Sequence, residues 1–223
     1  MKQARTYGQH CGIARALDLV GERWALLVIR ELVLGPKRFT DLRAGLSGVA
    51  TNVLTDRLKQ LERDGVVRRR TLPPPAASTV YELTEYGREL EPTLLAFGRW
   101  GAKSLGPRGG KQLVRPEWFC VALKAFFQPE AARGVRATVD LDLDGERFAV
   151  RIDRGSLEIS AGAPDASELR LTTDPQTLVR YLAGEGVPAR ALAADGDGAL
   201  LERLPAIFAF AQSRLRSAST SAT

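Results

Sequence analysis

The sequence predicts an α+β protein with two domains, and three observations support that prediction. Residues 38–83 follow the order helix, turn, helix and basic hairpin, which is typical of a winged helix-turn-helix. Residues 135–171 instead alternate apolar and polar side chains, which indicates an antiparallel sheet with one wet face and one apolar face. Between these regions, residues 106–110 read Gly-Pro-Arg-Gly-Gly, a composition typical of a hinge.

The two halves of the chain also differ in net charge. Residues 1–115 contain 20 lysines and arginines against 11 acidic residues, a balance of +9. Residues 116–223 contain 12 against 15, a balance of −3, and the two halves together give the formal net charge of +6. An excess of positive charge confined to one half favours a polyanion as the partner of that half. The alternative is that these basic residues only solvate a surface.

Four helices are predicted before the hairpin, because apolar residues recur at helical spacing and a glycine follows each run. The four helices cover residues 13–20, 23–34, 39–46 and 49–63. The hairpin begins with a strand that ends in three arginines at 68–70, followed by a Pro-Pro-Pro turn and a return strand at 80–83. Thr84 is a suitable N-cap for a long fifth helix over 85–105.

The helix over 49–63 is the one we expect to read DNA. Leu54, Leu58 and Leu61 recur at i, i+4 and i+7, so they should turn inward. The residues that then project outward are Thr51, Asn52, Thr55 and Lys59. Asn52 can pair bidentately with adenine, and a pair of this kind discriminates between bases by roughly 1–3 kcal/mol.

The basic hairpin and the residue before the 39–46 helix supply further cations. Because strand residues alternate between faces, we expect Arg68 and Arg70 on one face and Arg69 on the other. At least one of them should reach the minor groove or its phosphates. Arg38 is expected to hold a phosphate beside the amides at the start of its helix. The uncharged turn at 73–78 disfavours deep insertion into the minor groove.

Several motifs of residues 9–105 resemble the HxlR-type bacterial transcriptional regulators. They are Cys11, Gly21-Glu-Arg-Trp24, Arg38-Phe39-Thr-Asp-Leu42, Leu54-Thr-Asp-Arg57-Leu58, Leu61-Glu-Arg-Asp-Gly65 and Tyr81-Glu-Leu-Thr84. The resemblance implies a dimeric winged-helix repressor or activator. It also implies that Arg57 faces the DNA backbone, the alternative being a pair with Asp56 or Glu62 within the helix. The complete set of expected DNA contacts is Arg38, Thr51, Asn52, Thr55, Arg57, Lys59, Arg68 and Arg70.

The helix over 85–105 is the expected dimer contact. Its apolar positions are Leu90, Leu94, Leu95, Phe97 and Trp100. This stripe is longer and more aromatic than a small domain needs for its own core, so we expect it to pack on its twin in a homodimer. Two subunits would match the two half-sites of a pseudo-palindromic operator in double-stranded DNA. Burial of the stripe against the second domain is the alternative.

The second half is similar to sterol-carrier-protein domains over residues 116–212. The similarity lies in the order helix, four short strands and helices near 174–183 and 198–216. It also lies in Asp174-Pro-Gln-Thr-Leu178, Leu182-Ala-Gly184 and Asp195-Gly-Asp-Gly198. It implies an α/β sandwich, an antiparallel sheet covered by helices, with an apolar cavity that accepts a lipid-like or other apolar small molecule.

Aromatic residues of the second half are the candidates for lining such a cavity. They are Trp118, Phe119, Phe126, Phe127, Phe148 and Phe208. A filled core without a ligand is the alternative. Phe208 and Phe210 lie two residues apart on an expected helix, so we predict that they cannot both face one core, and that one of them faces a cavity, a partner or water.

Cysteine and histidine usage restricts the chemistry. Cys11 and Cys120 are the only cysteines, so no disulfide framework is expected. Cys11 follows His10 and is the candidate redox sensor, since some HxlR-type members use an N-terminal cysteine, although Gly12 stands where many of them have proline. With one histidine in the chain, we expect no catalytic triad, no metal site, no cofactor and no enzymatic activity. Cys120 lies among large apolar residues and is expected in a core.

Taken together, the sequence predicts a dimeric DNA-binding transcriptional regulator whose second domain binds an apolar effector. The alternative is a lipid carrier with a basic docking module. The expected organisation is a DNA-binding and dimerisation domain at 1–105, a linker at 106–115, a ligand-binding domain at 116–216 and a disordered tail at 217–223. No apolar run approaches the roughly 20 residues that a membrane span needs, so we expect a cytoplasmic protein without membrane contact.

Overall fold

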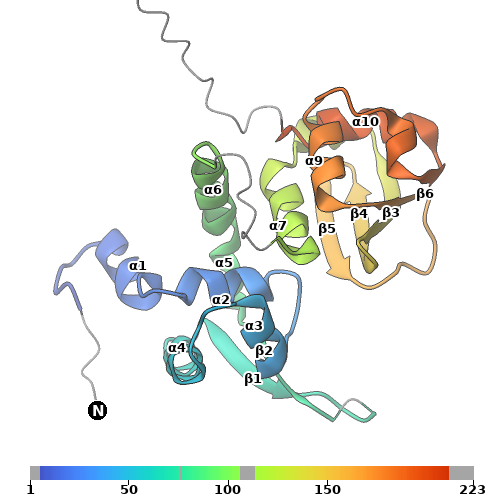
Figure 1. Cartoon of the computed structure of the whole chain (residues 1–223). Coiled ribbons are helices and arrows are strands. Elements are labelled where there is room, and N and C mark those ends of the chain that lie inside the picture. The colour runs from blue at the N-terminus through green and yellow to red at the C-terminus, as the bar shows by residue number, and fades with distance from the viewer. Residues whose placement is uncertain (1–5, 76, 106–113, 211–223) are drawn as a thin grey trace, which may run out of the picture. The chain divides into compact units, whose positions relative to one another are not determined.

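The computed structural model describes residues 6–75, 77–105 and 114–210 (Figure 1). The chain divides into two compact units, residues 1–94 and 95–223. The predicted tail at 217–223 lies outside the described residues, as does the predicted linker apart from its last two residues.

The first unit has the element order of a winged helix-turn-helix, as the sequence predicts. Its elements are α1 (Gly12–Val20), α2 (Ala25–Leu32), α3 (Phe39–Gly45), α4 (Thr51–Arg63), β1 (Val67–Thr71), β2 (Thr79–Leu83) and α5 (Glu85–Glu89). The strands β1 and β2 form the antiparallel hairpin of the wing. At the end of α4, Gly65 adopts φ +72°, and the amide of Val66 donates to the carbonyl of Leu61. This Schellman-type ending explains why the helix stops at the predicted glycine.

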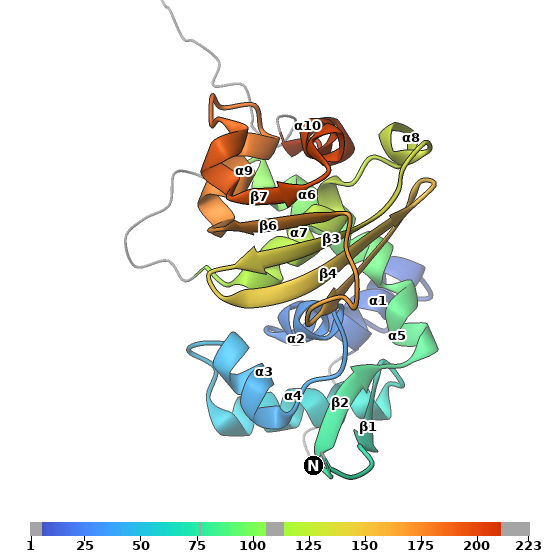
Figure 2. The ribbon, with the colours of Figure 1, turned by 90° about the vertical axis from the view of Figure 1, so that its right-hand side faces the viewer.

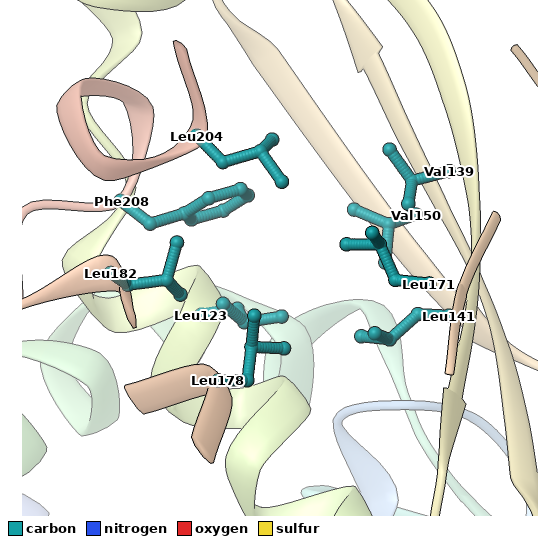
Figure 3. Close-up of a pocket in the computed structure, with 9 residues that line it drawn as sticks. All are labelled: Leu123, Val139, Leu141, Val150, Leu171, Leu178, Leu182, Leu204 and Phe208. Carbon is teal, nitrogen blue, oxygen red and sulfur yellow. The ribbon is translucent and has the colours of Figure 1, made fainter. Parts of the chain in front are cut away.

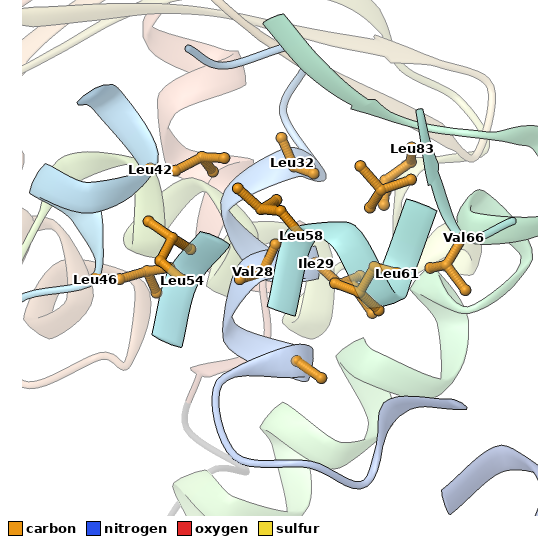
Figure 4. Close-up of a cluster of buried hydrophobic side chains, with 12 residues drawn as sticks. Val28, Ile29, Leu32, Leu42, Leu46, Leu54, Leu58, Leu61, Val66 and Leu83 are labelled. Atoms are coloured by element: carbon orange, nitrogen blue, oxygen red, sulfur yellow. The ribbon is translucent and has the colours of Figure 1, made fainter. Parts of the chain in front are cut away.

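The core of the first unit lies between α2, α3, α4 and the hairpin. Leu54, Leu58 and Leu61 of α4 are fully buried, as their spacing predicts. Figure 4 shows them pointing toward Val28 and Ile29 of α2. Because these leucines occupy one side of α4, its remaining sides are left for polar residues.

The prediction of one long helix over 85–105 is wrong, because the structure has two helices in this range. The structure has α5 (Glu85–Glu89) and α6 (Glu91–Ala102), separated at Leu90. Pro92 lacks the N–H that would bond to the carbonyl four residues earlier, and its ring crowds that carbonyl. The predicted N-cap is confirmed, since the Thr84 hydroxyl accepts from the amide of Gly87 at 3.0 Å.

The second unit, after the end of α6, is a five-stranded sheet with helices. Its elements are α7 (Pro116–Phe126), α8 (Pro129–Ala132), β3 (Arg136–Leu143), β4 (Glu146–Asp153), β5 (Ser156–Ala161), β6 (Leu169–Thr173), α9 (Pro175–Leu182), the 3₁₀ helix η1 (Ala189–Leu192), β7 (Ala194–Gly196) and α10 (Gly198–Ile207). The strand order is β5-β4-β3-β6-β7 (Figure 2). This mixed helix and sheet composition is the predicted class.

Two features of the sheet differ from the prediction of four antiparallel strands. β6 pairs with β3 in parallel, because the chain crosses from β5 at one edge to the far side of β3 before it extends again. The two-residue alternation reports which face is buried and not the direction of a neighbouring strand. The fifth strand, β7, has three exposed residues including a glycine, so no alternation marks it.

The predicted helix does not extend through Phe208 and Phe210, but one of the two, Phe208, does face a cavity, as expected. Both side chains are buried, and α10 ends before them at Ile207. Phe208 forms a β-bridge with Phe127, and the amide of Ala209 donates to the carbonyl of Phe126. The amide of Phe210 donates to the carbonyl of Phe208, so the chain turns between the two rings. The remainder of the predicted helix, 211–216, lies outside the described residues.

Candidate nucleic-acid interface

The outward side of α4 is polar. Thr51, Asn52 and Lys59 are exposed, and Thr55 is half-buried. The Thr55 hydroxyl donates to the carbonyl of Thr51 at 2.8 Å, so its proton already has a partner within the helix. The four residues therefore lie away from the buried leucines, and the side-chain amide of Asn52 has no hydrogen-bond partner among the residues that the structure describes.

The wing arginines lie on the two faces that strand alternation predicts. Arg68 and Arg70 of β1 both donate to Glu82 of β2, at 2.7 Å and at 3.0–3.1 Å. Arg69 points the other way and donates to Glu62 of α4 at 3.3 Å. Neither acid was expected to bind the wing arginines, although Glu82 stands directly opposite Arg68 in the hairpin register.

Glu82 remains charged in the hairpin. Burial raises the pKa of this carboxyl group, but hydrogen bonds and positive charge from Arg70 and Arg68 outweigh burial and hold the pKa below its usual range. Its side chain is 7% exposed, whereas those of Arg68 and Arg70 are 59% and 46% exposed. The buried carboxylate thus fixes two exposed guanidinium groups on one face of the wing.

Arg38 joins the start of α3 to the wing. Its backbone amide donates to the carboxylate of Asp41 at 3.1 Å, which satisfies the first turn of α3. Its Nε donates to the hydroxyl of Ser78 at the base of the wing turn, at 3.2 Å. The guanidinium is therefore beside the helix start, where the sequence predicts a phosphate contact.

Arg57 points toward the turn between α1 and α2. One Nη donates to Gln60 at 2.8 Å and the other to Glu22 at 3.3 Å, and the side chain is 12% exposed. Its partner is thus neither Asp56 nor Glu62. Its Nε is buried without a hydrogen-bond partner among the described residues. Contact with the DNA backbone stays a prediction for this residue.

A buried acid that the sequence analysis missed fixes α2, α3 and the wing relative to one another. The carboxylate of Glu31 accepts from Lys37 at 2.8 Å and from Arg30 at 2.7 Å, and its side chain has no exposed area. Lys37 pairs with Tyr81 through both backbone groups, so it forms an isolated β-bridge beside β2. A Cβ at position 45 would overlap the Glu31 carboxylate, so any larger residue there would force this carboxylate to move.

Comparison with known proteins places this unit in a family. The HxlR-like helix-turn-helix family matches residues 19–108. The HTH-type transcriptional regulator YvaP of Bacillus subtilis (strain 168) is 34% identical over 93 residues, which are 42% of this chain and 86% of that protein. The chain belongs to the HxlR-like helix-turn-helix family. It is accordingly a DNA-binding transcriptional regulator and not an enzyme.

Two further relatives of this HxlR-like regulator show the same extent of similarity. The HTH-type regulator sll1512 of Synechocystis sp. (strain ATCC 27184 / PCC 6803 / Kazusa) is 39% identical over 95 residues, 43% of this chain and 70% of that protein. The solved structure of the redox regulator HypR in its oxidised form has 32% identity and a TM-score of 0.41. It covers 44% of this chain and all of that one.

Cys11 of the HxlR-like regulator is exposed at the N-terminus of α1. The backbone amides of Ala14 and then Ile13 lower the pKa of its thiol below the ordinary value. The physical cause is therefore the start of a helix. Cys120 is buried, and burial raises the pKa of its thiol far above the ordinary value, as expected for a core residue.

The second unit of the HxlR-like regulator contains a small apolar cavity, with a volume of about 20 Å³. This is about the room that one water molecule needs. Figure 3 shows side chains from α7, α9 and α10 facing those of β3, β4 and β6. The lining residues are Leu123, Val139, Leu141, Val150, Leu171, Leu178, Leu182, Leu204 and Phe208. All of them are apolar.

Of the predicted cavity residues, Phe208 alone lines this cavity. Phe119 and Phe126 pack their rings on Phe210, and Phe127 packs on Phe208. Phe148 is buried in β4, and Trp118 of α7 is half-buried. Apart from Phe208 the lining is aliphatic, and the sequence signal for it was the two-residue alternation in the strands together with the leucines of α9 and α10.

Two absences hold for residues 6–75, 77–105 and 114–210. There, no group of three or more histidine, cysteine, aspartate or glutamate side chains could hold a metal ion. In the same ranges, no helix is long and apolar enough to cross a membrane.

Replacing the buried acid of the HxlR-like regulator should weaken its first unit in a pH-dependent way. Burial raises the pKa of Glu31, but Lys37 and Arg30 outweigh it and lower the pKa in the fold. Its ion pairs therefore stabilise at neutral pH and are lost as the pH falls below about 4.3, through the lowered pKa. Glu31→Gln should reduce the unfolding free energy at pH 7 by about 1–3 kcal/mol.

Urea denaturation at pH 7 and near pH 3 measures this effect. The difference between Glu31→Gln and the wild type should shrink at the lower pH. Glu62→Gln is the matched control, since its pair with Arg69 is exposed and should contribute less than about 1 kcal/mol. An equal loss for Glu31→Gln at both pH values would contradict the assignment of the stabilisation to the charged carboxylate.

Proposed function

We propose that this regulator binds a pseudo-palindromic operator as a homodimer, with α4 of each subunit in a major groove. The observation that supports this most directly is the division of α4 into a buried leucine face and an exposed polar face. Asn52 would read adenine, and the wing would hold the backbone through Arg68 and Arg70. Residues 1–105 would form this DNA-binding and dimerisation domain, joined by the linker at 106–115 to a ligand-binding domain at 116–216.

We propose that the remaining contacts position the protein on the DNA backbone. Arg38 and Lys59 would bind phosphates, and Thr51 and Thr55 would serve a base or a phosphate. Arg57 would reach a phosphate by sharing or leaving Glu22, which now accepts from it. The positive balance of residues 1–115 would attract the polyanion before any base is read.

Asn52→Ala should weaken binding to a selected operator but leave non-specific binding nearly unchanged. The lost bidentate pair is worth about 1–3 kcal/mol, so preference should relax at one base position in each half-site. Arg70→Ala is the contrasting variant: it should weaken binding to all duplexes and reduce the salt slope by about one. Fluorescence anisotropy over a salt series measures both effects.

The same titration separates the proposal from its rival. A steep salt dependence without any sequence preference in the wild type would favour a basic docking module attached to an apolar-ligand carrier. Equal losses for Asn52→Ala on every duplex would contradict the assignment of Asn52 to base reading.

Dimerisation is proposed through α6. Phe97 and Trp100 are 57% and 68% exposed, and their rings stack with centroids 5.7 Å apart. No residue of α6 is buried. Ile13 of α1 is also exposed, at 75%. Large exposed apolar groups on neighbouring positions of a helix are typical of an interface with another chain.

Trp100→Glu should convert the protein to monomers, because a charge would be buried against its partner in the dimer. Sedimentation velocity at micromolar concentration measures this change. Ala163→Glu, at an exposed position of the second unit, adds the same charge and should leave the association state unchanged. A dimer that persists in Trp100→Glu would place the interface elsewhere.

We also propose that the second domain is sterol-carrier-like and binds an apolar effector in the cavity of Figure 3, which would have to widen to admit a molecule larger than water. Because every lining residue is apolar, a polar group of the ligand would have to stay outside. Regulation requires that the ligand bind one dimer geometry better than the other, since an indifferent ligand shifts no equilibrium.

Native mass spectrometry of the purified protein should detect a copurifying apolar molecule. Leu178→Phe fills the cavity from α9 and should reduce its occupancy, whereas Leu17→Phe on the exposed side of α1 should not. Equal occupancy in both variants would exclude this cavity as the site.

Cys11 is the proposed redox sensor. Exposure and the amides of Ala14 and Ile13 favour its thiolate, the reactive form. Alkylation at neutral pH should therefore be faster at Cys11 than at Cys120, and prior treatment with peroxide should block it. A labelling rate unaffected by peroxide would leave Cys11 as an ordinary exposed thiol.

A further inference from the structure

We propose that Asp56 is a specificity-determining residue, which accepts a hydrogen bond from the N4 amino group of a cytosine in the major groove. This inference rests on the proposed function, because it requires α4 to lie in that groove. The contacts assigned above are all cationic or neutral, so an acid among them would add a kind of base recognition that they lack.

The position of Asp56 on α4 is the first argument. Asp56 lies two residues after Leu54 and two before Leu58, which is about 200° around the helix from each buried leucine. It is exposed, as is Asn52 one turn earlier. Residues four apart are neighbours on a helix surface, so the two side chains stand side by side on the outward face. Both lie in the first two turns of α4, the part that meets base edges in helix-turn-helix proteins.

The absence of a partner is the second argument. Glu62 of α4 binds Arg69, and Glu22 in the turn before α2 binds Arg57. Asp56 makes no hydrogen bond or ion pair with any residue that the structure describes. Its carboxylate is therefore available to an outside donor, whereas the acids that serve the fold are engaged.

Base chemistry decides which donor fits. A carboxylate only accepts hydrogen bonds. In the major groove, guanine offers two acceptors and thymine offers an acceptor and a methyl group. Adenine has a donor, but its N7 acceptor lies beside it and would face the second carboxylate oxygen. Cytosine presents the N4 donor without an adjacent acceptor, so it is the edge that a lone carboxylate matches.

Charge repulsion would make the pairing of Asp56 with cytosine selective for one sequence. An unpaired carboxylate near phosphates is repelled by every duplex. A cytosine amino group compensates for the repulsion at one position only. Asp56 would therefore lower non-specific affinity and restore affinity on the correct sequence. The simpler alternative is a solvated charge that repels all sequences equally.

The experiment compares base preferences of the wild type, Asp56→Asn and Asp56→Ala. Duplexes selected by the wild type from a randomised library are varied through all four base pairs at each position. The wild type should favour cytosine at one position per half-site by roughly 5- to 150-fold. Asp56→Asn should shift that preference to adenine, since asparagine pairs with adenine bidentately, and Asp56→Ala should abolish it.

The controls separate this inference from the function on which it rests. Asp165→Asn changes the charge equally at an exposed position of the second unit and should leave all base preferences unchanged. Uniformly tighter binding of Asp56→Asn to every duplex, with unaltered preferences, would overturn the inference. If Asn52→Ala alone altered a preference, base reading by α4 would stand and the role of Asp56 would fall. A wild type without any base preference would instead overturn the proposed function.

Discussion

Burial of the leucine face of α4 is the constraint on which the DNA-binding unit depends. Leu54, Leu58 and Leu61 fill the space between α2 and the hairpin, and burying each stabilises the fold by roughly 1.5–3 kcal/mol. Rotating α4 about its axis would expose all three at once. The same packing that stabilises the unit therefore fixes which residues face outward, so Asn52 and Asp56 are oriented by side chains that never meet a ligand.

Two buried carboxylates, Glu31 and Glu82, hold basic side chains of the DNA-binding unit in place. Glu31 holds Lys37, which pairs with Tyr81 of β2, and Glu82 holds Arg68 and Arg70. Burying an acid has a desolvation cost that ion pairs offset only in good geometry, so such pairs are weak evidence for stability. Their effect here is to orient the basic side chains that bind them. Each carboxylate accepts from two cations and thereby restricts where both can point.

The sequence was sufficient for the features that depend on local periodicity, and insufficient for those that depend on distant residues. Leucine spacing and glycine stops predicted α4, and strand alternation predicted the two faces of the wing. Pro92 marked the break before α6 but was overlooked. The parallel pairing of β6 and the contact of Arg57 with Glu22 join segments far apart in sequence, and no periodic pattern encodes them. Glu31 binds near neighbours, Arg30 and Lys37, but its burial depends on the packing of the whole unit.

The wing is less cationic than its three arginines suggest. Glu82 neutralises part of the charge on Arg68 and Arg70, and Glu62 faces Arg69. A phosphate that approached the wing would compete with carboxylates already in place, so each contact would be an exchange of partners rather than a new attraction. Replacing a carboxylate by a phosphate contributes less to the binding free energy than pairing a phosphate with an unpaired arginine would. In such an arrangement the wing would orient the protein on the duplex, and discrimination between sequences would fall to the outward face of α4.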